Sequence, residues 1–286
     1  MATTLLPRAT GPVAYVFARP LVSRRILGRP MQRTADAGLP VPGVSRDLRV
    51  KIASSAVEWE QALRLVTDNY QARGYETGNQ GELRFTAQHA LPDARLLVAK
   101  EGERVVATMS LFMDNVLLGL PMESIYGQEI KSLRAQGKRI CEVGSLAETS
   151  LGLQDFVHVF IALIRLAWQH HLHLGGDSAV IAVNPRHRAF YTKVLGFTPL
   201  GGCRPLPTVK NHPAEAYYLD PQMMQVKSPA MYERVFNDLL PAAALASRPL
   251  SAQRVRHFAA RSTQTDRRLV EELLRYVADC GSPRRW

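Results

Sequence analysis

The 286 residues contain only three cysteines, Cys141, Cys203 and Cys280, which lie far apart in the sequence. An odd and scattered set provides neither a disulfide framework nor the paired spacing of zinc ligands. The sequence therefore favours a reducing, cytoplasmic location and gives no sign of a metal site.

Long apolar runs are also lacking. The longest, residues 156–168, is interrupted by His158 and Arg165, whereas a helix needs about 18 uninterrupted apolar residues to cross a bilayer. The run predicts a buried helix and no membrane span.

Acidic residues are few, with 25 Asp and Glu against 36 Lys and Arg and a net charge of +11. No helix-turn-helix, zinc-finger or RNP signature accompanies this charge, so the sequence indicates no nucleic-acid partner. An acidic protein is the alternative, because a basic surface steers it by long-range attraction. The oligomeric state does not follow from the sequence.

The chain is predicted to have three parts. Residues 1–47 are rich in Gly and Pro, lack hydrophobic periodicity and carry seven arginines, which predicts a flexible basic tail. Residues 48–220 alternate helical and strand patterns, and residues 221–286 are predicted to form a helical extension with an apolar stripe from Leu269 to Val277. The arginines of the tail are Arg8, Arg19, Arg24, Arg25, Arg29, Arg33 and Arg46.

The middle part is predicted to be an α/β domain, with a mixed central sheet covered by helices. Glu101-Gly102-Glu103 lies between two apolar runs and predicts a hairpin. Apolar residues recur at helical spacing from Glu58 to Gly74. The expected strands are 95–100, 104–111, 139–148, 179–183, 197–201 and 214–219, and the expected helices after the first begin at Pro121 and near Phe156.

The strand at 139–148 carries the first candidate for chemistry. Glu142 shares a face with Ile140, so a carboxylate occupies a position where the pattern expects burial. Gly144 suggests a bulge, which would free backbone N–H groups near Ser145. A buried carboxylate of raised pKa can take the proton of an attacking amine, and free N–H groups can stabilise an oxyanion. The alternative is a structural Glu142 that is paired with Arg139.

The second candidate is the segment 184–197, which follows a short strand rich in β-branched residues. Pro185 suits the start of a helix and Gly196 its end. A strand, an asparagine, a short helix with the aromatic pair Phe190 and Tyr191, and a Gly-Phe step resemble the closing motif of the GNAT acyltransferase superfamily. In that fold two strands splay apart and admit an acyl thioester.

Four segments taken together resemble the long-chain N-acyl amino acid synthases, bacterial GNAT-fold relatives of the acyl-homoserine lactone synthases. The segments are 70–75, 119–126, 142–147 and 182–187, and an ordered set is more specific than one motif. The resemblance implies transfer of a fatty acyl group from acyl carrier protein to the amine of an amino acid. It implies a catalytic centre at Glu142, Gly144 and Ser145, and substrate contacts from Tyr70, Arg73, Tyr75, Asn184, Phe190 and Tyr191.

The expected donor is the acyl-phosphopantetheine of acyl carrier protein, with no permanently bound cofactor. Acyltransferases that use coenzyme A carry a Gly-rich turn whose N–H groups hold a pyrophosphate. Residues 148–155 contain one glycine and two acids, a poor cradle for such an anion. Acyl carrier protein is acidic, and the cations expected to dock it are Arg134, Lys138, Arg139, Arg186, Arg188 and Lys193.

Three alternatives stay open. An acyl-homoserine lactone synthase would also need S-adenosylmethionine, and a coenzyme A-dependent acetyltransferase would need the missing turn. A carrier-binding or regulatory module would keep the fold without turnover. Each basic residue taken singly also fits an ordinary solvated surface. The lipid product of the favoured reaction would bring a peripheral association with membranes. The apolar stripe of the helical extension is expected to pack over the acyl pocket of the same chain, where it would keep a fatty chain dry.

Overall fold

The computed structural model describes residues 38–76, 81–149 and 151–280 of the chain. The predicted basic tail lies outside the described residues as far as residue 37. No helix of the described part is long and apolar enough to cross a lipid bilayer.

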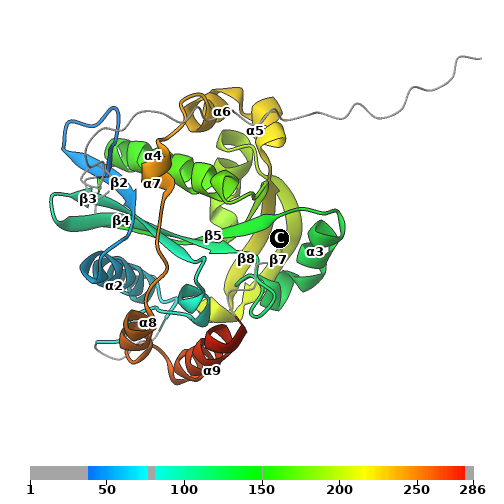
Figure 1. The fold of residues 1–286 in the computed structure, drawn as a ribbon. Helices are drawn as coiled ribbons and strands as arrows, with labels where there is room; N and C mark the ends of the chain where they lie inside the picture. The colour runs from blue at the N-terminus through cyan, green and yellow to red at the C-terminus, as the bar shows by residue number, and fades with distance from the viewer. Residues whose placement is uncertain (1–37, 77–80, 150, 281–286) are drawn as a thin grey trace, which may run out of the picture. The chain divides into compact units, whose positions relative to one another are not determined.

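The described residues form one mixed sheet in the order β1-β2-β3-β4-β5-β6-β8-β7 (Figure 1). Neighbouring strands are antiparallel except β5 and β6, which run parallel. This confirms the predicted mixed sheet. The strands are β1 (Leu39–Pro40), β2 (Leu48–Ile52), β3 (Arg95–Glu101), β4 (Arg104–Met113), β5 (Ile140–Glu148), β6 (Ser178–Val183), β7 (Thr198–Leu206) and β8 (His212–Leu219).

Helices cover both faces of the sheet (Figure 1). One face carries α4 (Leu153–His173), with α6 (Pro229–Phe236) and α7 (Ala242–Leu245) packed on it. The opposite face carries α2 (Ala56–Ala72), α8 (Ala252–Ala259) and α9 (Gln264–Cys280), and α3 (Glu123–Ala135) lies beside β7. The remaining helical segments are α5 (Pro221–Lys227), η1 (Ala87–Ala90), η2 (Pro185–His187), η3 (Phe190–Val194) and η4 (Pro207–Val209).

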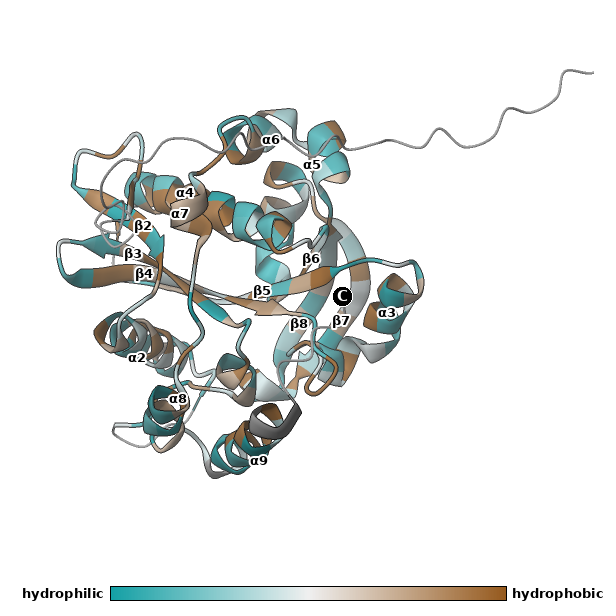
Figure 2. Ribbon diagram, viewed as in Figure 1, coloured by the Kyte–Doolittle hydropathy of each residue, from teal (hydrophilic) through white to brown (hydrophobic). Residues whose placement is uncertain are grey.

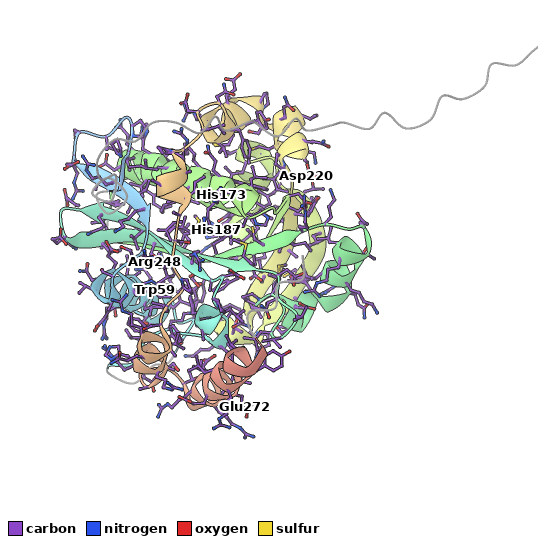
Figure 3. The ribbon with its side chains drawn as sticks, in the orientation of Figure 1. Trp59, His173, His187, Asp220, Arg248 and Glu272 are labelled. Carbon is purple, nitrogen blue, oxygen red and sulfur yellow. The ribbon has the colours of Figure 1, made fainter. Side chains whose placement is uncertain are left out.

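The sheet separates two main layers of apolar packing. Strands β3 and β4 are hydrophobic along most of their length (Figure 2), because alternate side chains contribute to each layer. Leu97 and Met109 pack with α4, whereas Leu96 and Phe112 pack on the opposite side with Trp59 of α2. Trp59 and α9, which carries Glu272, lie on the face opposite α4 (Figure 3).

Regular structure is present ahead of the predicted boundary at residue 48. Leu39 and Pro40 pair with Val50 and Arg49, and Val41 is buried in the core layer under α4. The composition of this segment predicted a flexible tail, but a short edge strand needs few apolar residues when its neighbour is buried.

The C-terminal extension is helical as predicted, but its apolar stripe packs in an unexpected place. Val270 and Leu273 of α9 and Phe258 of α8 join the layer opposite α4, where the Phe258 ring lies 6.2 Å from that of Trp59 and 5.8 Å from that of Phe85. We expected the stripe to cover the acyl pocket. It instead closes the core over α2, because the apolar surface left open by η1 and α2 is there.

We expect Phe258→Ala to lower the free energy of unfolding by about 3–5 kcal/mol, since it removes a fully buried ring from a packed layer. Urea unfolding followed by circular dichroism measures this loss. Leu239→Ala is the matched control, because the Leu239 side chain is 82% exposed. Equal stability of the two variants would show that α8 and α9 do not support the domain.

Candidate functional site

The site is created where β5 and β6 part. The two strands pair at three positions only, which end at Glu142 opposite Val180. Beyond this point β5 continues to Glu148 and β6 to Val183, and no pairing between them is found among the described residues. The resemblance to GNAT acyltransferases implied such a splay, and the register agrees with it.

A bulge in β5 lies at the same level. Ser110 of β4 pairs with Gly144 and Thr108 pairs with Ala147, so one residue of β4 faces two of β5. Ser145 takes up the irregularity with a φ of 52°, a left-handed conformation that non-glycine residues seldom adopt. The predicted bulge is therefore present, with Ser145 and not Gly144 in the unusual conformation.

A cavity of about 550 Å³ opens at this split and extends between the sheet and α4. On α4 its wall runs from Leu153 to Trp168, which spans about 22 Å at ~1.5 Å per residue. Every side chain in this deeper part is apolar or a buried thiol. The lining there comprises Met109, Leu111, Cys141, Val143, Phe156, Phe160, Ile164, Ala167, Trp168, Ala179 and Ile181.

The mouth of the cavity is polar and aromatic. The ring of Tyr75 lies 5.7 Å from that of Tyr70 and 4.7 Å from that of His212. Arg84 lies 4.4 Å above the Tyr70 ring. Burial raises the pKa of Tyr70, while the charge of Arg84 and a hydrogen bond with Ser145 act to lower it. Tyr70 therefore stays protonated at neutral pH and connects the mouth to the bulge.

Two arginines and a histidine complete the mouth. Arg186 donates from Nε to Nε2 of His187 at 2.9 Å and from Nη2 to the Tyr75 hydroxyl at 3.2 Å. Arg73 donates to the backbone and side-chain oxygens of Asn69. Partial burial and the charges of Arg186 and Arg73 lower the pKa of His187, so its ring is neutral at pH 7.

Most of the predicted substrate contacts meet at this cavity. Phe190 is the exception: it is not a lining residue, and its ring packs against those of Phe160 and Tyr191, at 5.4 Å and 5.5 Å. It supports the wall from behind. The predicted residues that line the cavity are Tyr70, Arg73, Tyr75, Gly144, Ser145, Asn184, Arg186 and Tyr191.

Glu142 lies on the face of the sheet opposite α4, away from the cavity. It pairs across the sheet with Phe112, whose ring packs on the face opposite α4, and it is not among the residues that line the cavity. Its Oε2 accepts the N–H of Met122 at 2.8 Å. Burial raises the pKa of its carboxyl from 4.5 to about 8, although the Met122 hydrogen bond acts to lower it. The pairing with Arg139 that the sequence left open is not formed, since Arg139 binds Asp177 at 3.1 Å.

Glu148 is the carboxylate that sequence reasoning missed. It pairs across the sheet with Ala107, which packs in the layer under α4, and among the described residues it is the one acid that lines the cavity. Its Oε2 accepts the N–H of Leu151 at 2.9 Å. The bulge explains the difference, because one inserted residue moves the following side chains to the other face of the sheet.

The cations expected to dock a carrier protein are not gathered at one place. Arg134, Lys138 and Arg139 lie at or before the start of β5, whereas the cavity opens toward its end. Four of the six are already paired with acids: Arg134 with Asp114 and Glu123, Lys138 with Asp220, Arg139 with Asp177, and Arg188 with Glu215. Within the described residues, Arg186 and Lys193 form no such pair.

No group of three or more His, Cys, Asp or Glu side chains in the described residues is arranged to hold a metal ion. Cys141, the thiol that lines the cavity, is fully buried, and burial raises its pKa well above its ordinary value. It is therefore not a thiolate at neutral pH and contributes apolar surface.

The chain is similar to known acyltransferases. The family profile described as N-acyl amino acid synthase FeeM matches residues 61–220. The solved structure of FeeM, an N-acyl amino acid synthase from uncultured soil microbes, is 29% identical, with 64% of this chain and 96% of that chain covered and a TM-score of 0.55. A search of curated proteins found no match.

Two further structures are acyl-homoserine lactone synthases. LasI is 12% identical, with 68% of this chain and 96% of that chain covered and a TM-score of 0.47. BjaI, described as dependent on coenzyme A, is 19% identical, with 74% and 99% covered and a TM-score of 0.46.

We expect the stability of the protein to fall as the pH rises from about 5 to 8 because of Glu142. The pKa of this carboxyl is raised on folding, so the folded state keeps a proton that the unfolded chain releases above its ordinary pKa of 4.5. The stabilisation that this proton gives is complete below the ordinary pKa and is lost as the pH rises through about 8. Over this range the free energy of unfolding falls by up to about 1.4 kcal/mol per pH unit.

Urea unfolding of the wild type and Glu142→Gln at pH 5, 6, 7 and 8 measures this effect. As the pH rises, the free energy of unfolding of Glu142→Gln should increase relative to that of the wild type. Glu233→Gln, an exposed change on α6, should show the same pH dependence as the wild type. Parallel curves for all three proteins would contradict a protonated, buried Glu142.

Proposed function

Because this chain belongs to the FeeM family of N-acyl amino acid synthases, we propose that it transfers a long-chain fatty acyl group from acyl carrier protein to the amine of an amino acid. The enzyme is an N-acyltransferase of GNAT-like fold. One observation supports the finer assignment: a single cavity joins a polar mouth at the split of β5 and β6 to a long apolar interior under α4.

The apolar interior suits a fatty chain. Phe156, Phe160 and Ile164 follow one another along α4 at intervals of about one turn, so they offer a continuous apolar wall. Each methylene buried against such a wall contributes about 0.8 kcal/mol. A short acyl group such as acetyl would leave most of this surface empty.

The mouth suits direct attack of the amine on the thioester. The Ser145 hydroxyl is hydrogen-bonded to Tyr70, and the thiol of Cys141 is held protonated by burial, so neither side chain is an activated nucleophile. The amine nitrogen bonds to the thioester carbon and the C–S bond breaks. A base takes a proton from the amine nitrogen, and the carrier leaves as a thiolate that receives a proton from this base or from water. Backbone N–H groups freed at the β5 bulge are suited to bind the developing oxyanion.

Two carboxylates of β5 are candidates for the base. The sequence favoured Glu142, whose raised pKa fits a proton acceptor near neutrality. The geometry favours Glu148, because it lines the cavity while Glu142 faces the opposite side of the sheet. We assign proton transfer to Glu148. Glu142 has a structural role, because it accepts the N–H of Met122 and so holds that segment against β5.

The carrier-bound donor is supported by a basic residue close to the cavity. Lys193 lies on η3, which also carries the cavity-lining Tyr191, and its exposed charge forms no ion pair within the described part of the chain. Acyl carrier protein is acidic, and attraction across such a surface raises the rate of encounter. We further propose that residues 48–220 carry out acyl transfer and that the extension from residue 221 supports the core.

The product identifies the reaction. We expect the purified full-length protein, supplied with palmitoyl-acyl carrier protein and a mixture of the twenty amino acids, to form an N-acyl amino acid detectable by mass spectrometry. Activity should fall with added salt, and palmitoyl-coenzyme A should be a poorer donor. An acyl-homoserine lactone formed only with S-adenosylmethionine, or no transfer to any amine, would overturn the proposal.

The cavity wall should determine the chain length that is accepted. Ala167→Leu adds bulk to the deep part of the cavity, so we expect optimum activity to move to acyl donors several carbons shorter. The measurement is kcat/KM across a series of acyl-carrier donors of increasing length. An unchanged optimum with unchanged melting temperature would show that the chain does not lie under α4.

The base is tested by two matched substitutions. We expect Glu148→Gln to lower kcat by about two to four orders of magnitude, with partial recovery at high pH where the acceptor amine is already deprotonated. Glu142→Gln should lower it much less. The reverse order of effects in pH–rate profiles would assign the proton transfer to Glu142, acting through water or the strand.

A further inference from the structure

We propose that Arg73, Arg186 and His187 form an anion site at the cavity mouth that binds the α-carboxylate of the acceptor amino acid. This inference rests on the proposed function, because it requires that the acceptor carry a carboxylate. It assigns Arg186, which the sequence favoured for carrier docking, to the acceptor.

Arg73 and Arg186 carry positive charges that no carboxylate of the described residues neutralises by an ion pair. The charges of both Arg186 and Arg73 act on His187, so the three basic groups are neighbours. Neither arginine forms an ion pair with a carboxylate in the described part of the chain. Elsewhere in it, cations such as Arg134 and Arg188 are matched by acids. Two neighbouring guanidinium groups that line the cavity, neither of them paired with an acid in the described part of the chain, create a positive potential that an anion neutralises.

The guanidinium of Arg186 is held in a fixed orientation. Its Nε donates to His187 and its Nη2 to the Tyr75 hydroxyl, so one edge of the guanidinium is fixed by the protein. Because Nε2 of His187 accepts this bond, the ring is neutral and carries its proton on Nδ1. Nη1 has no protein partner among the described residues. The end formed by Nη1 and Nη2 is therefore available, in a fixed plane, to bind both oxygens of a carboxylate.

The position of Arg186 at the split of β5 and β6 favours the acceptor over the donor as its ligand. Arg186 lies three residues beyond the end of β6, and Val183, Asn184 and Arg186 all line the cavity at the split. In an amino acid the amine and carboxylate are attached to the same carbon, so a carboxylate held here brings the amine to the thioester. The phosphate of the donor is separated from its thioester by the whole pantetheine arm, which places it far outside the split.

The aromatic groups beside the cluster fit the same ligand. Tyr75 contacts Arg186 through its hydroxyl and packs edge-on against Tyr70 and His212. An amino-acid side chain that leaves the α-carbon beside Arg186 would meet these rings. The mouth therefore offers contacts for both the α-carboxylate and the side chain, the two groups that distinguish an amino acid from a simple amine.

The test compares the acceptor amino acid identified in the product assay with its carboxamide, at saturating donor. We expect Arg186→Gln to raise KM for the acid about tenfold or more, since it removes a charge-assisted pair of hydrogen bonds, and to leave KM for the amide unchanged. Arg186→Lys should recover only part of the preference. Arg234→Gln, an exposed arginine on α6, is the control and should match the wild type.

Two outcomes would overturn the inference while acyl transfer itself stands. One is a wild-type enzyme that acylates acid and amide equally well. The other is an Arg186→Gln variant whose KM rises for acyl-phosphopantetheine but not for acyl-pantetheine, which would assign the cluster to the donor phosphate. If no acyl amino acid forms, calorimetric titration of the wild type with free amino acids and their amides decides: equal binding, or none, overturns the site.

Discussion

The short pairing between β5 and β6 is the constraint on which the site depends. Three paired positions are enough to keep the two parallel strands in one sheet, and their separation beyond Val180 exposes backbone groups that would otherwise be hydrogen-bonded. Such groups are costly to bury unless a partner replaces the missing strand. The surrounding elements meet this need: α4 closes one side, η2 and η3 continue from the end of β6, and the aromatic residues of the mouth close the other side.

The β5 bulge explains why the sequence predicted an irregular strand correctly but did not predict which face of the sheet Glu142 and Glu148 occupy. The irregularity was predictable, because a glycine inside an otherwise apolar strand is a known signal. Its consequence was not, since the face of each later residue depends on whether the extra residue falls before or after it. Without the bulge Glu142 and Glu148 would share a face. With it, Glu142 pairs opposite Phe112 and Glu148 opposite Ala107, so one carboxylate supports the strand and the other lines the cavity.

The elements of the domain could be predicted because each carries a local signal. The helix α2 has a capping box between Ser55 and Glu58, the hairpin β3–β4 has its Glu-Gly-Glu turn, and α4 has a long apolar period. The ion pairs were harder to predict, because whether a cation is paired depends on an acid that is distant in the sequence. Arg139 is matched by Asp177 and Arg134 by Asp114, which no local pattern reveals. The position of α8 and α9 likewise depends on which apolar surface the rest of the chain leaves uncovered.

The cavity combines two environments that the proposed chemistry needs at opposite ends. A fatty chain is stabilised by leaving water for an apolar wall, whereas proton transfer from the attacking amine needs a base within hydrogen-bond reach, directly or through water. In this chain the deep wall of α4 and the sheet is apolar, and every charged residue that lines the cavity is at the split or its mouth. The reacting carbon must lie at the boundary between them, which is where β5 is irregular and Ser145 adopts its left-handed conformation. Strain of this kind costs about 1–3 kcal/mol and persists only where surrounding packing maintains it, so the core that α4 and α2 build on the two faces of the sheet also fixes the geometry of the site.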